Sequence, residues 1–428
     1  MMVNQRVRRC LKRSSSQPIK ESNMMKSIKH MLASLTLAAG VLSAPAAANE
    51  NPQLSDRTFR TVNKVQELIA EEKYNDAISK LNKALSNSSK KKYDRAVLLQ
   101  QMGFLYSLKD NYPKAAKYFS DALKADALPV PVAQQVRYSL AQLYLAEEQY
   151  KKSVNTMNTW FKVAKTTKEK PPAHAYITLA SAYVQMGNYR NAITPTKKAI
   201  SMTKSPNESW YLLLVSSHYE LKQYKSVASV LKTLTNKYPK KKRYWMQLSG
   251  VYMELNQNKN ALATLEAAYK LGLLEGEKEH LRLVNFMAYQ GIPHRAAKIM
   301  AQEMVNKNIA RTHANIEKQA SFYHQAKELD EAISIYKQAF KIAPSGKQQI
   351  RIVKLMIQDK QFKQATAFAN NSSNAKRDEK AELAYLKGMA YFELDQHQNA
   401  LKAMKTAAQS SSMKSSAEPW IAFLEDQS

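Results

Sequence analysis

Residues 242–275 read KRYWMQLSGVYMELNQNKNALATLEAAYKLGLLE, and this stretch decides the fold. In its first half, Trp245 and Tyr252 stand on one helical face, with the small residue Ser249 between them. The second half is organised around the small residue Ala261. Small residues at these places let two antiparallel helices approach closely, while large residues interlock around them. The stretch therefore predicts a helix–turn–helix unit.

The same pattern recurs along the chain, and each copy can be aligned on its later small residue. These anchors are Ala77, Ala115, Ser153, Ala192, Val227, Ala261, Ala296, Ala332, Ala365 and Ala400. Successive anchors lie 33 to 39 residues apart, and a period of about 34 is typical of the tetratricopeptide repeat. One unit cannot bury its own apolar face, so stacked neighbours must share it. We predict an all-α tetratricopeptide-repeat solenoid of about ten helix pairs.

The boundaries of the array follow from the same register. We expect the superhelix to cover residues 58–414, with weak units at 277–310 and 346–379. Residues 415–428 should form a capping helix and tail, in which Trp420 and Ile421 seal the last unit. Longer loops are expected after the second helices of the first three units, at 87–92, 128–131 and 166–172.

Composition narrows the class of protein further. The 428 residues include only nine glycines and one cysteine, Cys10. No G-x-G-x-x-G or P-loop string is present, which excludes the familiar glycine-rich phosphate cradles. A single cysteine allows neither an internal disulfide nor a multi-cysteine zinc site.

The N-terminus is typical of an export signal. Residues 25–48 combine two early lysines, an apolar run from Met31 to Ser43, and an Ala-rich cleavage site before Asn49. The run is too short for a bilayer span of about 20 residues. Residues 1–24 are interpreted as an over-extended gene start, and 49–57 as the mature N-terminal segment. We expect a periplasmic product that does not span the membrane after cleavage.

The mature chain is strongly basic, with 57 Lys and Arg against 34 Asp and Glu, a net charge of +23. This balance favours acidic partners, but export argues against nucleic acid. The basic runs at 90–92 and 240–243 are better explained as solvated loops at helix ends than as binding sites.

No catalytic or metal-binding constellation emerges. The histidines lack metal spacing, and adjacent glutamates such as Glu147 and Glu148 do not face each other on a helix. We predict no enzyme activity, no metal and no cofactor. Binding should instead use side chains of the first helix of each repeat, which lines the groove of such arrays. The candidates are Tyr138, Gln142, Ile177, Ser181, Tyr219, Glu220, Arg243, Met246, Met253 and Glu254.

Several strings go beyond the general repeat pattern. They are residues 244–252 and 265–274, the run Trp210–Leu214, and Trp420 with Ile421. Through them the chain, from about Leu54 to Glu425, resembles exported tetratricopeptide proteins that are encoded with TonB-type energy-transduction components in Gram-negative bacteria. The resemblance implies a non-enzymatic periplasmic scaffold with TonB, ExbB and ExbD as partners, in a system that energises iron and haem receptors. The alternative hypothesis is a basic cell-envelope protein that binds peptidoglycan or lipopolysaccharide.

Overall fold

The computed structural model describes residues 52–88, 90–167, 170–370 and 373–427. The segments 1–24 and 25–48 assigned above lie outside the described residues. The chain divides into two compact units, the first ending at Pro239 and the second beginning at Lys240. Each unit is described by itself.

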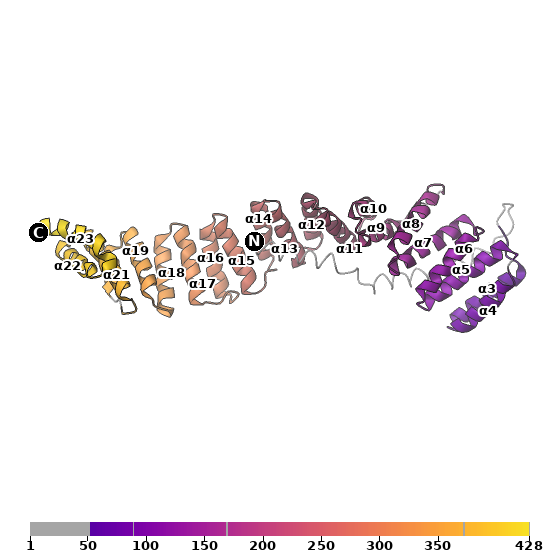
Figure 1. Cartoon of the computed structure of the whole chain (residues 1–428), viewed down its shortest axis with the longest axis horizontal. Coiled ribbons are helices and arrows are strands. Elements are labelled where there is room, and N and C mark those ends of the chain that lie inside the picture. Colours follow the sequence, from indigo (N-terminus) through magenta and orange to yellow (C-terminus); the bar gives the residue numbers. More distant parts are fainter. Residues whose placement is uncertain (1–51, 89, 168–169, 371–372, 428) are drawn as a thin grey trace. The chain divides into compact units, whose positions relative to one another are not determined.

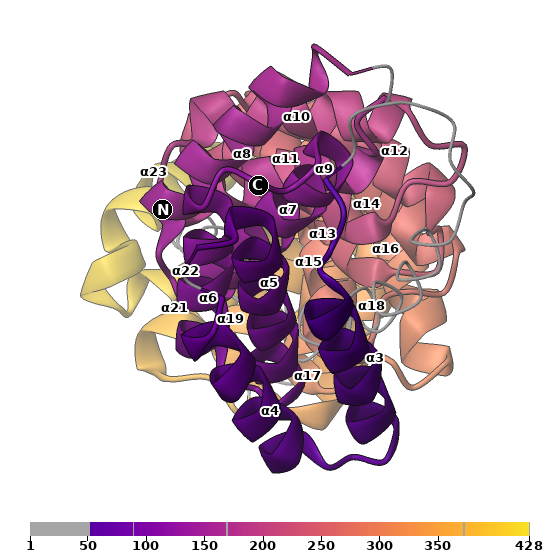
Figure 2. The same ribbon diagram turned by 90° about the vertical axis from the view of Figure 1, so that its right-hand side faces the viewer.

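The first unit contains ten helices in the part that the structure describes (Figure 1). They are α3 (Asp56–Ala70), α4 (Tyr74–Ser86), α5 (Lys92–Leu108), α6 (Tyr112–Lys124), α7 (Val130–Ala146), α8 (Tyr150–Ala164), α9 (Ala173–Gln185), α10 (Tyr189–Ser201), α11 (Glu208–Glu220) and α12 (Tyr224–Lys237). Each packs on the next, and α3 also contacts α5, as Figure 2 shows at the N-terminal end.

The second unit contains eleven helices in its described residues. They are α13 (Lys242–Glu254), α14 (Asn258–Lys270), α15 (Gly276–Tyr289), α16 (Pro293–Val305), α17 (His313–Gln325), α18 (Leu329–Ile342), α19 (Gly346–Gln358), α20 (Phe362–Asn370), α21 (Arg377–Phe392), α22 (His397–Ala408) and α23 (Ser411–Asp426). The odd-numbered helices α3 to α21 are the first helices of ten repeats, and the even-numbered α4 to α22 are the second helices. The predicted solenoid of about ten helix pairs is confirmed.

The anchors aligned in the sequence are the points where the two helices of a repeat meet. All ten, from Ala77 to Ala400, have no exposed surface. Two contacts, one at the anchor Ser153 and one at Gly103 on the facing side of another helix pair, show how closely the paired helices approach. The hydroxyl of Ser153 donates to the carbonyl of Ala141 at 2.7 Å, across the helix pair. A Cβ added to Gly103 would lie 2.4 Å from the Phe119 ring.

The turn inside each repeat is nearly invariant. In nine repeats it is three residues long, and in all ten one residue adopts a positive φ of 55° to 77°. The following amide then donates to a carbonyl five residues back, as Asn111 N does to Tyr106 O at 2.9 Å. This is the Schellman ending of a helix. Only Gly187 and Gly291 are glycines, and the other eight residues tolerate a backbone that favours glycine.

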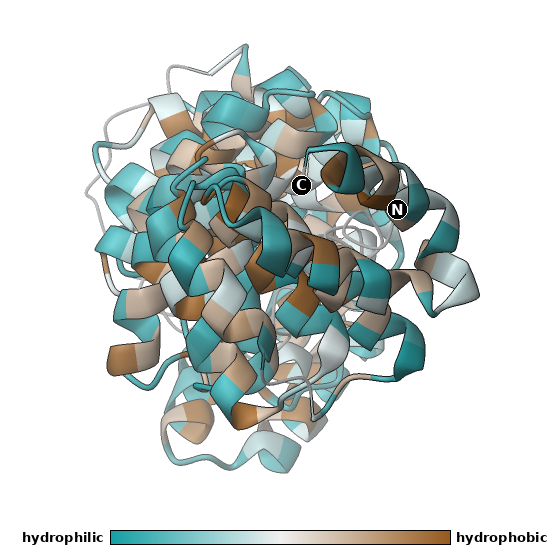
Figure 3. Cartoon of the chain, turned by 90° about the vertical axis from the view of Figure 1, so that its left-hand side faces the viewer, coloured by the Kyte–Doolittle hydropathy of each residue, from teal (hydrophilic) through white to brown (hydrophobic). Residues whose placement is uncertain are grey.

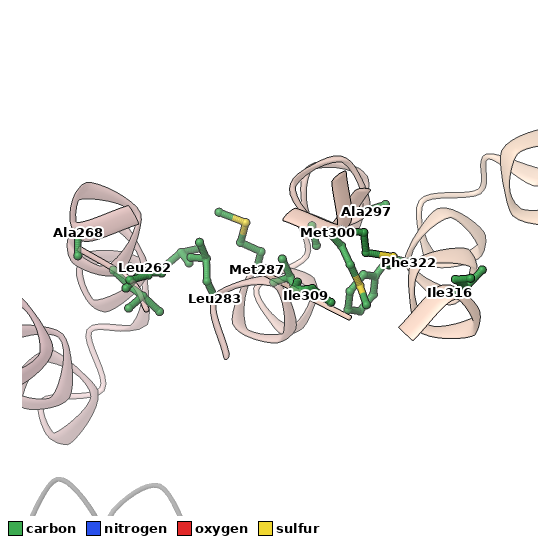
Figure 4. Close-up of a cluster of buried hydrophobic side chains, with 14 of the residues drawn as sticks. Leu262, Ala268, Leu283, Met287, Ala297, Met300, Ile309, Ile316 and Phe322 are labelled. Atoms are coloured by element: carbon green, nitrogen blue, oxygen red, sulfur yellow. The ribbon is translucent and has the colours of Figure 1, made fainter. Parts of the chain in front are cut away.

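The core runs along each unit rather than gathering at one centre. A cluster in the second unit includes Leu262, Leu283, Met300 and Phe322, so it spans five successive helices, α14 to α18 with Ala339 (Figure 4). Single helices show apolar and polar residues side by side in Figure 3, as expected for helices that bury one stripe. Each repeat therefore completes the core of its neighbours.

The boundaries differ from the expected ones by a few residues. Helix α3 starts at Asp56 rather than at 58, and the C-terminal helix α23 starts at Ser411 rather than at 415. Trp420 and Ile421 lie partly buried against the last repeat, in a cluster with Met404. The weak unit at 346–379 contains α20, which has only nine residues.

Candidate functional site

The ten predicted groove residues divide between the two units. Six lie in the first unit, on α7, α9 and α11, and four lie in the second, all on α13. Ser181 is buried, and Glu220 and Arg243 are exposed. The other seven are half-buried. All ten therefore lie on first helices, of three repeats in the first unit and one repeat in the second.

Several of these side chains are already engaged within their own unit. The Tyr138 hydroxyl lies 3.3 Å from that of Thr178 on the next repeat. The Arg243 guanidinium stacks over the Tyr244 ring, 4.6 Å from its centre. Met246 packs against the α14–α18 core. One oxygen of Glu254 is buried without a hydrogen-bond partner among the described residues, which makes this carboxylate the least satisfied of the set.

The hollow in the second unit lies farther along the chain, at α17. An open groove of about 590 Å³ is lined by Ala314, Glu317, Lys318, Ser321, His324, Tyr336 and Arg351. The five residues from α17 form one broad stripe along that helix, because each lies three or four positions from another member and only Glu317 and Lys318 are adjacent. Tyr336 comes from α18 and Arg351 from α19. We call this the α17 groove.

An ion pair forms one wall of the α17 groove. The Arg351 Nη1 lies 2.6 Å from Glu317 Oε1, and its guanidinium also covers the Tyr336 ring at 5.5 Å. Burial raises the pKa of the Tyr336 hydroxyl, which keeps it a neutral hydrogen-bonding group. Glu317 and Arg351 cancel each other's charge and hold α17 against α19.

Two other groove residues have no such partner. Lys318 and His324 make no hydrogen bond or ion pair with any residue that the structure describes, and the His324 side chain is exposed. After the Glu317–Arg351 pair is discounted, Lys318 leaves the α17 groove with a net positive charge. The groove therefore offers cationic and polar donors to a ligand that carries carboxylates.

The α17 groove continues into a charged ladder along the first helices. Lys354 on α19 pairs with Glu382 on α21 at 2.6 Å, so α19 is tied to the first helices on both sides. On the opposite side of α19, the Gln348 side chain hydrogen-bonds to His313 of α17. These contacts fix the spacing of the groove walls without filling the groove.

The repeat register contained the signal for this site. Counted from His313, the α17 lining residues occupy positions 2, 5, 6, 9 and 12 of their unit. Most of the predicted candidates were taken from these same positions in earlier units. The predicted candidates end on α13, because nothing local in the sequence shows which repeat leaves its first-helix face open.

The basic runs and histidines also have defined surroundings. Lys242, at the start of α13, pairs with Glu275 at 2.8 Å and Glu279 at 3.3 Å, and the hydrogen bond that its ammonium donates to Glu275 raises the pKa of Lys242. His280 is buried, with Nε2 3.5 Å from Glu303 Oε2. Within the described ranges, no group of three or more His, Cys, Asp or Glu is placed to hold a metal ion. None of the described helices is both long and apolar enough to cross a bilayer.

Comparisons with known families support the repeat assignment. Two tetratricopeptide-repeat models match, one at residues 109–156 and the other at 317–345 and 381–412. The model of anaphase-promoting complex, cyclosome, subunit 3 matches residues 185–268. The fold and these matches define the class: the chain folds as an all-α solenoid that contains tetratricopeptide repeats, and solenoids of this class are typically non-catalytic scaffolds for protein–protein interaction.

Solved structures of similar fold include a tetratricopeptide-repeat protein from Parabacteroides merdae, with 14% identity and a TM-score of 0.37 over 71% of this chain and 100% of that one. YrrB, described as having an unusual peptide-binding site, has 15% identity and a TM-score of 0.36 over 44% and 91%. MamA from Desulfovibrio magneticus has 12% identity and a TM-score of 0.34 over 41% and 94%. A search of curated proteins gave no match.

Proposed function

We propose that the protein is a non-enzymatic scaffold that binds an extended, acidic segment of a partner protein in the α17 groove. The observation that carries this proposal is the pair of unpartnered donors, Lys318 and His324, beside a charge-neutralised wall. The groove is open along the helix, which suits an extended chain better than an enclosed small molecule.

The α17 groove is tested by charge reversal. The variant Lys318→Glu places a carboxylate where the acidic segment would bind, without touching the Glu317–Arg351 pair. The matched control is Lys298→Glu on α16, an exposed lysine outside the groove. In-cell crosslinking of tagged protein should lose its partner with Lys318→Glu and keep it with the control. Retention of the partner by both variants would contradict the assignment of the groove.

We further propose that the scaffold acts in the periplasm as an accessory of a TonB–ExbB–ExbD system. Support comes from the signal-like segment 25–48 and from the strings at 244–252 and 265–274 that resemble the associated family. Crosslinking under iron limitation, followed by mass spectrometry, should enrich TonB, ExbB or ExbD over an untagged control. Normal growth of a deletion strain on haem as sole iron source, with intact TonB assembly, would argue against this role.

Localisation can be tested separately. We expect the tagged chain to be released from Gram-negative cells by osmotic shock, with an N-terminus at Asn49. A full-length precursor beginning at Met1 in the cytoplasmic fraction would contradict the export assignment. It would leave the groove test unaffected.

A further inference from the structure

Three successive second helices of the first unit, α8, α10 and α12, contain no acidic residue. Together they carry nine basic ones, all exposed: Lys151, Lys152, Lys162, Arg190, Lys197, Lys198, Lys225, Lys232 and Lys237. In the second unit, α14, α16 and α18 mix six basic residues with four acidic ones, and α20 and α22 also lack acidic residues but carry only three basic ones between them. We call the exposed side of α8, α10 and α12 the basic face.

None of these nine charges is neutralised by the protein. No ion pair within the described ranges involves any of them. Two of them have neighbours that carry no negative charge: Lys152 donates to Gln149 at 2.8 Å, and Lys237 lies 5.9 Å from the centre of the Tyr211 ring. A solvated surface usually mixes charges of both signs, which limits repulsion. Here the repulsion is left uncompensated.

Three of the nine charges, Lys162, Lys198 and Lys237, lie in the last turn of their helix, where the helix dipole favours cations, but three others are placed where they do not help the helices. Lys151, Arg190 and Lys225 each occupy the first turn of their helix, directly after a tyrosine, and those turns contain no acid. The positive end of the helix dipole disfavours cations there. A role in stabilising the helices therefore does not explain these residues, whereas binding of an external anion does.

The charges are regularly spaced on each helix. On α8, Lys151, Asn155, Asn158 and Lys162 follow one another at steps of four, three and four, which places them on one stripe. The equivalent stripes are Arg190, Thr194, Lys197 and Ser201 on α10, and Lys225, Ser229, Lys232 and Asn236 on α12. All twelve residues are exposed. Cations thus alternate with amides and hydroxyls along three helices that α9 and α11 hold in series.

This chemistry selects among polyanions. None of the exposed large apolar residues found in the described part of the chain lies on these three helices, so a wedge for bilayer insertion is missing there. The face offers lysine rather than arginine, with one arginine among nine, and no fully exposed aromatic ring for base stacking. Lysines interspersed with amides and hydroxyls match a chain of sugars that bears repeated negative charges and many hydroxyl groups.

We propose that the basic face of α8, α10 and α12 binds an anionic polysaccharide. This proposal is independent of the α17 groove, which lies in the other unit. Because the interaction is built from exposed charges, its affinity falls as ionic strength rises.

The test uses the purified mature chain and polygalacturonate, with neutral dextran of the same size as the reference polymer. The variant Lys162→Gln/Lys197→Gln/Lys232→Gln removes one lysine of the exposed stripe from each helix of the face. The matched control, Lys259→Gln/Lys298→Gln/Lys341→Gln, removes three exposed lysines from second helices of the other unit and changes the net charge equally. We expect the first variant to bind polygalacturonate about tenfold more weakly at low salt, and the control to bind almost normally.

Other results would overturn the proposal. Equal losses in both variants would reduce the effect to net charge, and equal binding of dextran would remove the role of the anion. Tighter binding of duplex DNA than of polygalacturonate would assign the face to nucleic acid. Binding to phosphatidylglycerol vesicles without binding to polygalacturonate would assign it to a membrane surface. Circular dichroism of both variants checks that the helices are retained.

Discussion

The turn that joins the two helices of one repeat and the connection that joins one repeat to the next are built in different ways. Inside a repeat, a short turn with one left-handed residue and one Schellman bond recurs ten times. Between repeats, the connections vary from three residues, between α18 and α19, to eight, between α8 and α9. Some of these connections are held by a polar network that is found in one repeat and not in the others. The comparison teaches that the repeat itself is specified by local pattern, whereas its attachment to the next is specified by particular side chains.

Glu303 is the clearest example of a side chain that links one repeat to the next. Its carboxylate is buried on α16 and accepts from Tyr269 of α14 at 2.7 Å and from Asn308, in the loop to α17, at 2.6 Å. His280 of α15 lies at 3.5 Å. One side chain therefore ties three successive helices to the loop that starts the next repeat.

The largest expected effect comes from removing this carboxylate. Glu303→Ala should lower the free energy of unfolding by about 3 kcal/mol, because it leaves buried donors without an acceptor. Urea denaturation measures the loss, and hydrogen exchange should place it in α14 to α17. The control Glu331→Ala, on an exposed side chain of α18, should change stability by less than about 0.5 kcal/mol. Similar values for the two variants would contradict the role of the network.

The packing of the two helices of one repeat should be disrupted by adding a methyl group at Gly103, where α5 and α6 approach closely. In Gly103→Ala the new methyl group would meet the Phe119 ring at 2.4 Å, and a ring cannot move aside within a packed core. We expect a loss of about 2 kcal/mol on urea denaturation. Gly388→Ala is the matched case, since its nearest atom is the flexible end of Met404 at 2.9 Å. There the better helix propensity of alanine should offset most of the strain.

The pH dependence of Glu303 sharpens the comparison further. Burial raises its pKa, but hydrogen bonds from Asn308 and Tyr269 and the nearby His280 outweigh burial, so the net pKa lies below the ordinary 4.5. Because the pKa of Glu303 is lower in the folded state than in the unfolded state, its ionised carboxylate stabilises the fold above about pH 4.5. This contribution is lost as the pH falls through the folded-state pKa. Unfolding free energies measured from pH 6 to about 3 should therefore decline less steeply for Glu303→Gln than for the wild type. Parallel declines would show that the carboxylate is not coupled to folding.

The smallest expected effect is a gain in stability at a turn inside a repeat. Lys222 has a φ of 55°, which favours glycine, and its side chain is exposed. Lys222→Gly should raise the free energy of unfolding by about 0.5 to 1 kcal/mol, because glycine adopts this backbone without strain. Ser229→Gly, in the interior of α12, should instead lower it by about 0.5 kcal/mol. A loss of stability in both variants would show that φ does not govern the turn.

The same contrast explains how far the sequence could predict the structure. The ten anchors and the solenoid depend on spacing within about 34 residues, so they could be read directly. The partners of Glu303 lie 34, 23 and 5 residues away, on Tyr269, His280 and Asn308. No periodicity marks them, because the network occurs in one repeat only.

The candidate site was predictable in kind but not in place. The register placed the predicted binding residues on first helices, and six of the seven residues that line the α17 groove, Lys318 and His324 among them, also lie on first helices. The predicted residues end at Glu254 and do not reach α17. The open groove arises where the α17 stripe is flanked by Tyr336 and Arg351 from two other helices, and the sequence does not show that flanking. Which faces stay open depends on how neighbouring side chains fill each space, and that is settled only by three-dimensional packing.

The uniform turn inside the repeat also bears on how such a chain can lengthen or shorten. A gene segment of 33 to 39 codons, cut within two connections between repeats, leaves every internal turn and its Schellman bond intact. Duplication or deletion of that segment would then add or remove one whole helix pair. Repeats that hold a one-off network, such as the one around Glu303, are the places where such an event would be resisted. Because the internal turn is self-contained, the whole repeat is the segment that can be duplicated or deleted, except where a network such as that of Glu303 makes one repeat depend on its neighbour.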